Sequence, residues 1–239
     1  MAEVREGEQA GRSPLRREGL ADDVLAVAAG ALARWRGAGR AVTIVALDGH
    51  GASGKTTIAQ QLCAVTGASL VHTDDFFSTD AASRERSGNR TLASYYDVSR
   101  LRREALEPLK AGREAVFHPY DWEAGALSHR LVRVAPTDLV VLEGVYSAAR
   151  LLADLVDKAI YVKTPEPERL GRLQGRVAPD EWDSEWLRAE QEYFSAERTG
   201  ESFDLVIRGS STAPPVPRGA RAPVEGRRAG HFSPHPDSP

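Results

Sequence analysis

Cysteine and lysine are scarce in this chain of 239 residues, which has one cysteine, Cys63, and four lysines among its 31 basic residues. A single cysteine excludes a disulfide within the chain and a zinc site built from several cysteines. No apolar run approaches the roughly 18 residues of a membrane-spanning helix, and residues 1–19 lack the apolar segment of a secretory signal. The net charge of −3 disfavours a generally basic nucleic-acid-binding protein. We therefore expect a cytoplasmic protein that binds neither membrane nor nucleic acid.

Apolar stretches and amphipathic stretches alternate along most of the chain. The continuous apolar runs 42–47, 139–142 and 159–162 are typical of strands that are buried on both faces. The other expected strands are 69–71, 115–117, 131–134 and 203–207, and the expected helices are 20–36, 55–65, 100–110, 151–155, 166–176 and 186–198. This alternation predicts an α/β fold in which helices cover both faces of a mostly parallel central sheet.

The two ends of the chain differ in composition from its middle. Residues 1–19 are charged and aperiodic, and we expect a flexible arm. Residues 209–239 hold seven of the chain's 14 prolines. This segment can bury too little apolar surface to offset the conformational entropy that it would lose on ordering. We expect that segment to be a disordered tail, with one domain over 20–208 that begins with the helix 20–36.

A glycine-rich loop follows the first apolar strand and precedes a helix. It matches the pattern G-x-x-x-x-G-K-[ST] in that structural context, and its residues are Gly49, His50, Gly51, Ala52, Ser53, Gly54, Lys55 and Thr56. Glycines let successive backbone N–H groups turn inward around phosphate oxygens, and the following helix adds its positive end. Lys55 is expected to reach the outer phosphates, Thr56 to bind Mg²⁺, and Thr57 to lie near the phosphates. The sequence lacks the N-K-x-D motif of GTPases and the signature of ABC-type ATPases, which leaves a small kinase or a stand-alone ATPase.

Acidic residues follow two of the expected strands. Asp74 and Asp75 come after 69–71, and Glu143 comes after 139–142. Ligands of such sheets bind at the carboxyl ends of the strands. We therefore predict that Asp74 orients or deprotonates an acceptor hydroxyl. Glu143 is predicted to be the carboxylate on the metal side of the site. The alternatives are a helix cap for the two aspartates and a solvated strand end for Glu143.

Six segments together resemble the uridine kinase, nicotinamide riboside kinase and phosphoribulokinase group of P-loop kinases. They are DGHGASGKTT (48–57), HTDDFF (72–77), YYDVSRL (95–101), HPYDW (118–122), VVLEGVY (140–146) and PERLGRLQGR (167–176), in the family's order across residues 42–208. The resemblance implies a P-loop NTPase three-layer fold, ATP and Mg²⁺ as cofactors, and a small-molecule alcohol, above all a nucleoside, as phosphate acceptor.

The resemblance also implies roles for individual residues. Asp74 would activate the acceptor hydroxyl, and Tyr96 and Asp97 would hold ribose hydroxyls. Tyr120, Asp121 and Trp122 would line the pocket for the acceptor's base. The arginines of the expected lid helix would clamp the triphosphate, with Arg172 and Arg176 on the nucleotide and Arg169 toward the substrate.

Several alternatives stay open at the level of sequence. Asp97 suits a helix cap, Trp122 a core position, and the three arginines a solvated helix face. The family's lid carries further arginines, whereas residues 177–184 have none. A kinase for a non-nucleoside alcohol such as pantothenate or a sugar phosphate, or a non-catalytic ATP-binding accessory protein, therefore remains an alternative to a nucleoside kinase.

Overall fold

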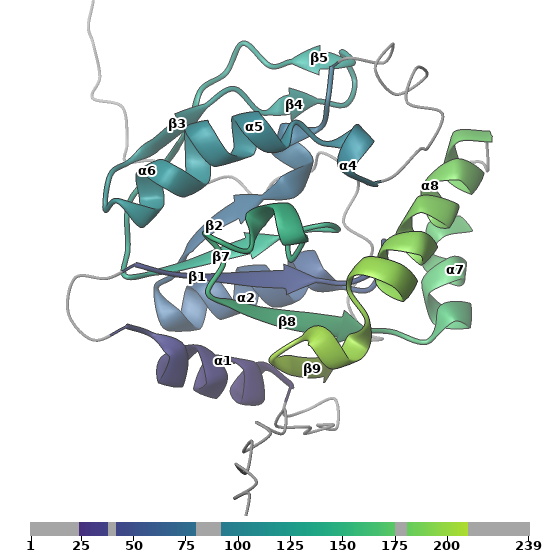
Figure 1. The fold of residues 1–239 in the computed structure, drawn as a ribbon, viewed down its shortest axis with the longest axis horizontal. Helices are drawn as coiled ribbons and strands as arrows, with labels where there is room; N and C mark the ends of the chain where they lie inside the picture. Colours follow the sequence, from purple (N-terminus) through teal and green to yellow (C-terminus); the bar gives the residue numbers. More distant parts are fainter. Residues whose placement is uncertain (1–23, 38–41, 80–91, 175–180, 210–239) are drawn as a thin grey trace, which may run out of the picture.

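A parallel sheet forms the centre of the molecule in a computed structural model, which describes residues 24–37, 42–79, 92–174 and 181–209 (Figure 1). Its five strands lie in the order β2-β7-β1-β8-β9, and every neighbouring pair is parallel. They are β1 (Thr43–Asp48), β2 (Ser69–His72), β7 (Leu139–Glu143), β8 (Lys158–Lys163) and β9 (Leu205–Arg208). The predicted mostly parallel sheet is confirmed.

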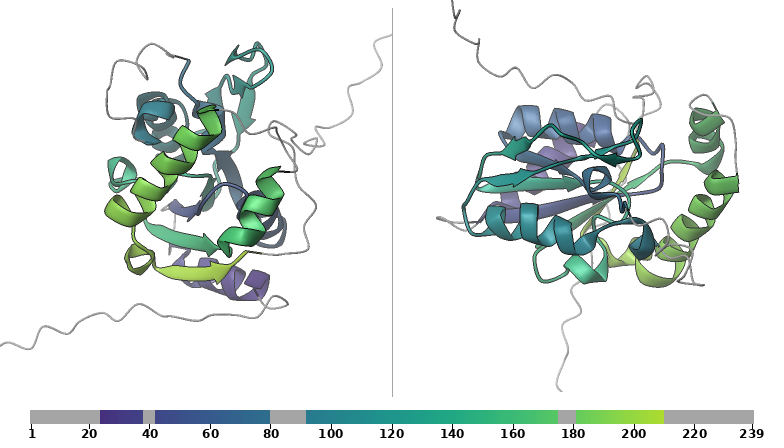
Figure 2. Two further views of the ribbon diagram at one scale, coloured as in Figure 1. Left: turned by 90° about the vertical axis from the view of Figure 1, so that its right-hand side faces the viewer. Right: turned by 90° about the horizontal axis from the view of Figure 1, so that it is seen from above.

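Helices cover both faces of this sheet (Figures 1 and 2). On one face α1 (Val24–Trp35) and α2 (Lys55–Thr66) pack against the side of β1 that carries Val45 and Leu47. On the other face the side of β1 that carries Ile44 packs against one long helical segment. That segment is made of α5 (Val98–Leu101), the π-helical η2 (Arg102–Leu106) and α6 (Glu107–Lys110). Because alternate side chains of a strand point to opposite faces, the uniformly apolar β1 is buried on both sides, and the three-layer fold is confirmed.

Two helices lie beyond the carboxyl ends of β1 and β8; they overlap in Figure 1 and stand apart in both views of Figure 2. They are α7 (Glu166–Gln174) and α8 (Glu181–Glu192), and α8 continues as the π-helical turn η4 (Tyr193–Glu197). The predicted helix 186–198 therefore begins five residues earlier than expected. These helices stand next to the glycine-rich loop, and the predicted helix 166–176 is confirmed as far as Gln174.

Short elements sit above the sheet face covered by α5 and α6. β3 (Ala115–Phe117) pairs with β6 (Val132–Val134), and β4 (Tyr120–Asp121) pairs with β5 (Ala126–Leu127), both antiparallel. Further short elements are α4 (Leu92–Tyr95) and the 3-10 turns η1 (Thr73–Phe76) and η5 (Gly200–Ser202). The first pair was expected as strands, but not as a pair outside the main sheet.

One predicted helix is wrong. Residues 151–155 form no α-helix, because the segment holds only the 3-10 turn η3 (Arg150–Leu152). Leu152 is fully buried and Leu155 packs half-buried on the same cluster, while Leu151 is 55% exposed. The apolar contacts of the segment are therefore too few to stabilise a longer helix. The predicted arm 1–19 and the tail beyond Gly209 lie outside the described residues.

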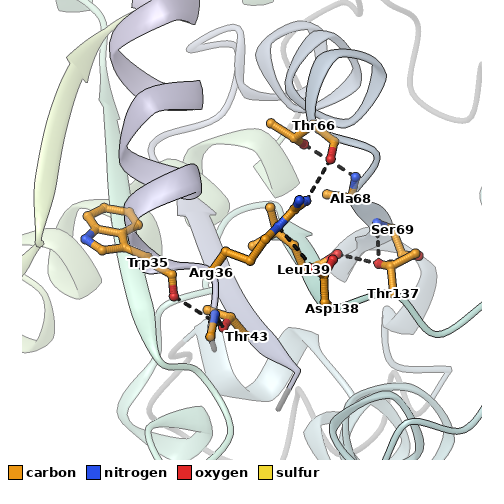
Figure 3. Close-up of polar contacts among 10 residues, drawn as sticks. Trp35, Arg36, Thr43, Thr66, Ala68, Ser69, Thr137, Asp138 and Leu139 are labelled. Carbon is orange, nitrogen blue, oxygen red and sulfur yellow. Dashed lines mark hydrogen bonds and ion pairs between the residues drawn. The ribbon is translucent and has the colours of Figure 1, made fainter. Parts of the chain in front are cut away.

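A polar network ties the elements together at the amino ends of the strands, opposite the loop (Figure 3). Arg36, just after α1, donates to the carbonyl oxygen of Thr66 at the end of α2 (2.7 Å) and lies 3.3 Å from the carboxylate of Asp138 before β7. Ser69 N–H donates to Thr137 Oγ1 (3.1 Å). Within the described ranges no helix is long and apolar enough to span a bilayer.

Candidate active site

The glycine-rich loop runs from the carboxyl end of β1 to the first residue of α2. Gly49, Ala52 and Gly54 have φ angles of 151°, 61° and 90°, in the region that favours glycine. A Cβ atom added at Gly49 would clash with the carbonyl oxygen of Val162 on β8. Lys55 is buried, and its Nζ donates to the carbonyl oxygen of His50 (2.9 Å). The predicted strand–loop–helix context of the motif is confirmed, and Thr57 lies half-buried in the first turn of α2.

The predicted metal-side pair is in contact. Thr56 Oγ1 donates to Glu143 Oε1 (3.2 Å), and Glu143 is 5% exposed at the end of β7. Burial opposes the charged form of Glu143, but the hydrogen bond and charge of His72, the Lys55 charge and the Thr56 hydroxyl outweigh it and lower the carboxyl's pKa. Glu143 is thus a buried ionised carboxylate beside a hydroxyl, and these hard oxygen ligands suit Mg²⁺. Within the described residues no cluster of three or more His, Cys, Asp or Glu could hold a metal ion. Mg²⁺ bound mainly through substrate phosphates needs no such cage.

Asp74 and Tyr96 come together although 22 residues separate them. Tyr96 OH donates to Asp74 Oδ1 (3.0 Å), and Phe77 forms an isolated β-bridge with Tyr96. Asp74 itself is exposed, whereas its neighbour Asp75 is 8% exposed. Of the two adjacent carboxylates, Asp74 is therefore the one that a solute can reach.

A cluster of aromatic rings centres on Phe77, three residues after Asp74. Phe77 lies 4.6 Å from Trp122 and 5.1 Å from Tyr120 between ring centroids, and Tyr120 and Trp122 are 5.0 Å apart. Tyr96 is stacked with Tyr146 at 6.0 Å. Tyr120 and Trp122 are both half-buried, so their faces are partly available for stacking on a planar group.

The two other acidic residues of the expected acceptor pocket are engaged with their own backbone. Asp97 Oδ1 accepts from Arg100 N–H (2.9 Å) as the cap of α5. Asp121 Oδ1 accepts from the N–H groups of Glu123 (3.0 Å) and Ala124 (3.1 Å). Each carboxylate therefore stabilises a local turn, and Asp97 is the helix cap that the sequence left open as an alternative. One oxygen of each carboxylate takes no part in these hydrogen bonds.

Of the two described arginines of α7, Arg172 contacts the loop directly and Arg169 contacts α8. Arg172 NH1 donates to the carbonyl oxygen of Ala52 (3.0 Å). Arg169 is 6% exposed, and its NH1 lies 3.7 Å from Glu190 Oε2 on α8. The alternative of a solvated face is therefore wrong for Arg169. Arg176 lies outside the described residues.

Sequence reasoning missed several groups that contact the loop or the metal-side carboxylate. His72 Nδ1 lies 2.6 Å from Glu143 Oε2. Glu190 and Tyr193 of the α8 segment contact Gly51 N–H and Asp48. The only sequence signal for Glu190 was its position on the apolar face of a helix, four residues after Trp186.

His50 fills the loop, as expected, rather than facing solvent. Its ring packs 4.2 Å from that of Phe194, and its Nδ1 lies 3.1 Å from Tyr161 OH. Burial, with the charges of Arg169 and Lys55, lowers the pKa of His50 to about 3, so the imidazole is neutral and adds no charge to the loop.

Together the three-layer parallel sheet and this loop define a P-loop nucleotide-binding protein. Residues 44–198 match the model of the AAA domain family, and the chain belongs to that family. Its sequence is also similar to curated uridine kinases. It is 29% identical over 134 residues to that of Halobacterium salinarum, covering 54% of this chain and 59% of the relative. It is 27% identical over 141 residues to that of Staphylococcus aureus, covering 56% and 67%.

Solved structures of small-molecule kinases share the fold of this chain. A possible uridine kinase from Bacillus stearothermophilus superimposes with a TM-score of 0.60 at 25% identity, covering 78% of this chain and 98% of that one. A D-glycerate 3-kinase from Cryptococcus neoformans reaches 0.58 at 17% identity, with 77% and 95% covered, and shows the shared fold alone. The relatives are small-molecule kinases, and the chain spans about three fifths of the length of the Halobacterium enzyme.

Proposed function

We propose that this protein is an ATP-dependent kinase that transfers the γ-phosphate to a hydroxyl group of a nucleoside. The observation that carries the proposal is the convergence of three predicted groups on neighbouring strands. Glu143 is the register partner of both His72 on β2 and Leu47 on β1. Asp74 follows β2 and the loop follows β1, so acceptor-side and nucleotide-side groups flank Glu143 at one edge of the sheet.

The transfer follows from the roles of these side chains. The acceptor oxygen forms a bond to the γ-phosphorus, the bond from that phosphorus to the β,γ-bridging oxygen breaks, and Asp74 takes the hydroxyl proton. Lys55 and the lid arginines Arg169, Arg172 and Arg176 stabilise negative charge on the transferred group. Thr56 and Glu143 would hold Mg²⁺, which when bound neutralises charge on the phosphate oxygens.

The nucleoside assignment rests on the acceptor side. Tyr96 OH is hydrogen-bonded to Asp74. Asp121 keeps one oxygen outside its turn bonds, and the second oxygen of Asp97 lies 3.9 Å from Arg100 Nε and can still accept from a ribose hydroxyl, which donates well to carboxylates. Tyr120 and Trp122 offer half-buried ring faces to a base. The similarity to uridine kinases supports the same substrate class, and a cytoplasmic location stays a prediction.

An acceptor panel tests the proposal. ADP release would be measured with Mg²⁺ and ATP in the presence of uridine, cytidine, nicotinamide riboside, other nucleosides, pantothenate or simple sugars. We expect one ribonucleoside to stimulate ADP release at least tenfold over the rate without acceptor. Stimulation by pantothenate or a sugar alone would contradict the nucleoside assignment. ATP binding without stimulation by any acceptor would contradict the kinase assignment.

A further inference from the structure

A fully buried carboxylate, that of Glu190 on α8, lies against the phosphate loop. Its exposed fraction is 0%. Oε1 accepts two hydrogen bonds, from Gly51 N–H (2.9 Å) and from the indole Nε1 of Trp186 (2.7 Å). Oε2 has no hydrogen-bond partner among the described residues. One oxygen of Glu190 therefore accepts from a backbone N–H of the loop, and the other is left without a hydrogen-bond donor among the described residues.

The second oxygen faces a lid arginine. Arg169 NH1 lies 3.7 Å from Glu190 Oε2, too far for a good hydrogen bond but close enough for an ion pair. That NH1 is also buried and has no hydrogen-bond partner in the described part of the chain. The other carboxylate near Arg169 is Glu166, at 3.9 Å, whose side chain is 72% exposed. Solvent screens an exposed pair strongly, so Glu190 is the partner that dominates the field at Arg169.

Stability alone gives little reason for a charge at this position. A buried ion pair loses most of its Coulomb energy to desolvation, and apolar replacements are often neutral or stabilising. An uncharged side chain of the same helical segment already packs against the loop, because the ring of Phe194 lies on that of His50. Packing of this segment on the loop therefore does not require a charge. Burial raises the pKa of Glu190, opposed by Lys55, Gly51 N–H, Arg169 and Trp186. The carboxylate is costly where it stands, yet it is surrounded by the groups that meet the outer phosphates of a nucleotide.

We propose that Glu190 is a positioning residue for phosphoryl transfer, whose charge holds Arg169 over the phosphate loop. The role rests on the proposed kinase function and deepens it. The Arg169 guanidinium, the Trp186 indole and one loop N–H converge on the carboxylate, so it sets where the guanidinium of α7 lies relative to the loop on which α8 rests. Because chemistry is sensitive to small displacements of charge-stabilising groups, the loss of this hold acts on the rate of transfer more than on binding.

Glu190→Gln tests the charge and leaves the shape. The amide oxygen of glutamine still accepts from Gly51 and Trp186, while the charge facing Arg169 is gone. We expect kcat to fall about 10- to 100-fold, which is the range seen when a residue that orients a directly acting side chain is replaced. The KM for ATP should change less than threefold. Glu166→Gln, which removes the exposed partner of the same arginine, is the matched control and should leave both constants within twofold of wild type. A Glu190→Gln enzyme with wild-type kcat would overturn the proposal.

A double-mutant cycle with Arg169→Gln tests whether Glu190 acts through the arginine. In the Arg169→Gln background, Glu190→Gln should lower kcat by less than twofold. A loss as large as in the wild-type background would overturn the proposal, because the two residues would then act independently. Should Glu190→Gln fail to fold, Glu190→Asp keeps the charge and retracts it by one methylene, and the same cycle applies.

Calorimetric binding of ATP and AMP separates this proposal from the proposed function. Neither nucleotide needs an acceptor to bind. Glu190→Gln should leave the Kd values for ATP and AMP within threefold of wild type, because the residue positions Arg169 for transfer rather than for binding. A Kd for ATP that rises as far as kcat falls contradicts the positioning role. A wild-type protein that binds ATP but phosphorylates nothing contradicts only the kinase function.

Discussion

Asp48, the last residue of β1, organises the start of the loop through four hydrogen bonds. Its carboxylate accepts from the N–H groups of Gly49 (2.7 Å), Tyr146 (3.2 Å) and Ala148 (2.9 Å) and from Tyr193 OH (2.7 Å). Burial raises the pKa of Asp48 from 3.8 to about 6, although these donors and Lys55 oppose the shift. Between those two values the folded protein holds a proton that the unfolded chain has released, so stability falls as pH rises through that range.

Tyr193→Phe removes one of these donors from a buried carboxylate. We expect the free energy of unfolding to fall by about 1–3 kcal/mol at pH 7.5. The loss should be smaller at pH 5, because Asp48 is then protonated in the folded state and needs fewer donors. Urea unfolding at both pH values measures it, with Tyr161→Phe, whose hydroxyl lies next to the neutral His50, as the matched control. An equal loss at the two pH values would contradict the role given to the Asp48 charge.

Individual site residues differed in how far sequence could predict them. Lys55 and Thr56 lie in one short motif, and Asp74 and Glu143 follow apolar strands, so local pattern was enough. Glu190 and His72 could not be found this way, because their partners Gly51 and Glu143 are 139 and 71 residues away in the chain. Only the packing of α8 and of β2 beside β7 makes those pairs.

At the scale of elements, α7 is held down on the loop from both of its ends. Arg172 NH1 donates to the carbonyl oxygen of Ala52, and Thr164, just before the helix, donates to the carbonyl oxygen of Ser53 (2.8 Å). Both bonds join the lid to loop backbone rather than to another helix. A nucleotide in the loop is therefore next to the base of α7.

Arg172→Ala should weaken nucleotide binding. Loss of a charged donor at the loop is worth about 1.5–3 kcal/mol, which corresponds to a rise in the KM for ATP of about tenfold or more. The KM for the acceptor should change less than threefold. Arg188→Ala, an exposed position on α8, is the matched control in the same steady-state assay. An unchanged KM for ATP in Arg172→Ala would show that α7 does not contact the nucleotide.

Long elements were predictable and short ones were not. The strands β1, β7 and β8 are continuous apolar runs, and such short runs are typical of strands that are buried on both faces. The hairpin of Tyr120–Asp121 with Ala126–Leu127 has two residues in each strand, too few to show a period of two. It turns at Gly125, with φ 63°, and is placed by packing of Tyr120 and Trp122 on Phe77 rather than by its own pattern.

The whole molecule separates its chemistry from its structural support. The phosphate loop, Asp74 and Glu143 lie at the carboxyl ends of β1, β2 and β7, whereas the network of Figure 3 lies at the amino ends of the strands. Arg36→Ala should lower the free energy of unfolding by up to about 1 kcal/mol, since the ion pair with Asp138 is partly exposed. Its kcat and KM values should stay within twofold of wild type. A larger kinetic effect would show that the two ends of the sheet are coupled.

In the proposed reaction, Asp74 activates an acceptor hydroxyl for attack on ATP bound at the loop. The most direct test is Asp74→Asn, with the phosphorylated nucleoside quantified by mass spectrometry and ATP binding measured by calorimetry on the same preparations. We expect the variant to form product at least about 100-fold more slowly than wild type, with a Kd for ATP within threefold of the wild-type value. Product formed at the wild-type rate by Asp74→Asn would contradict this role of Asp74.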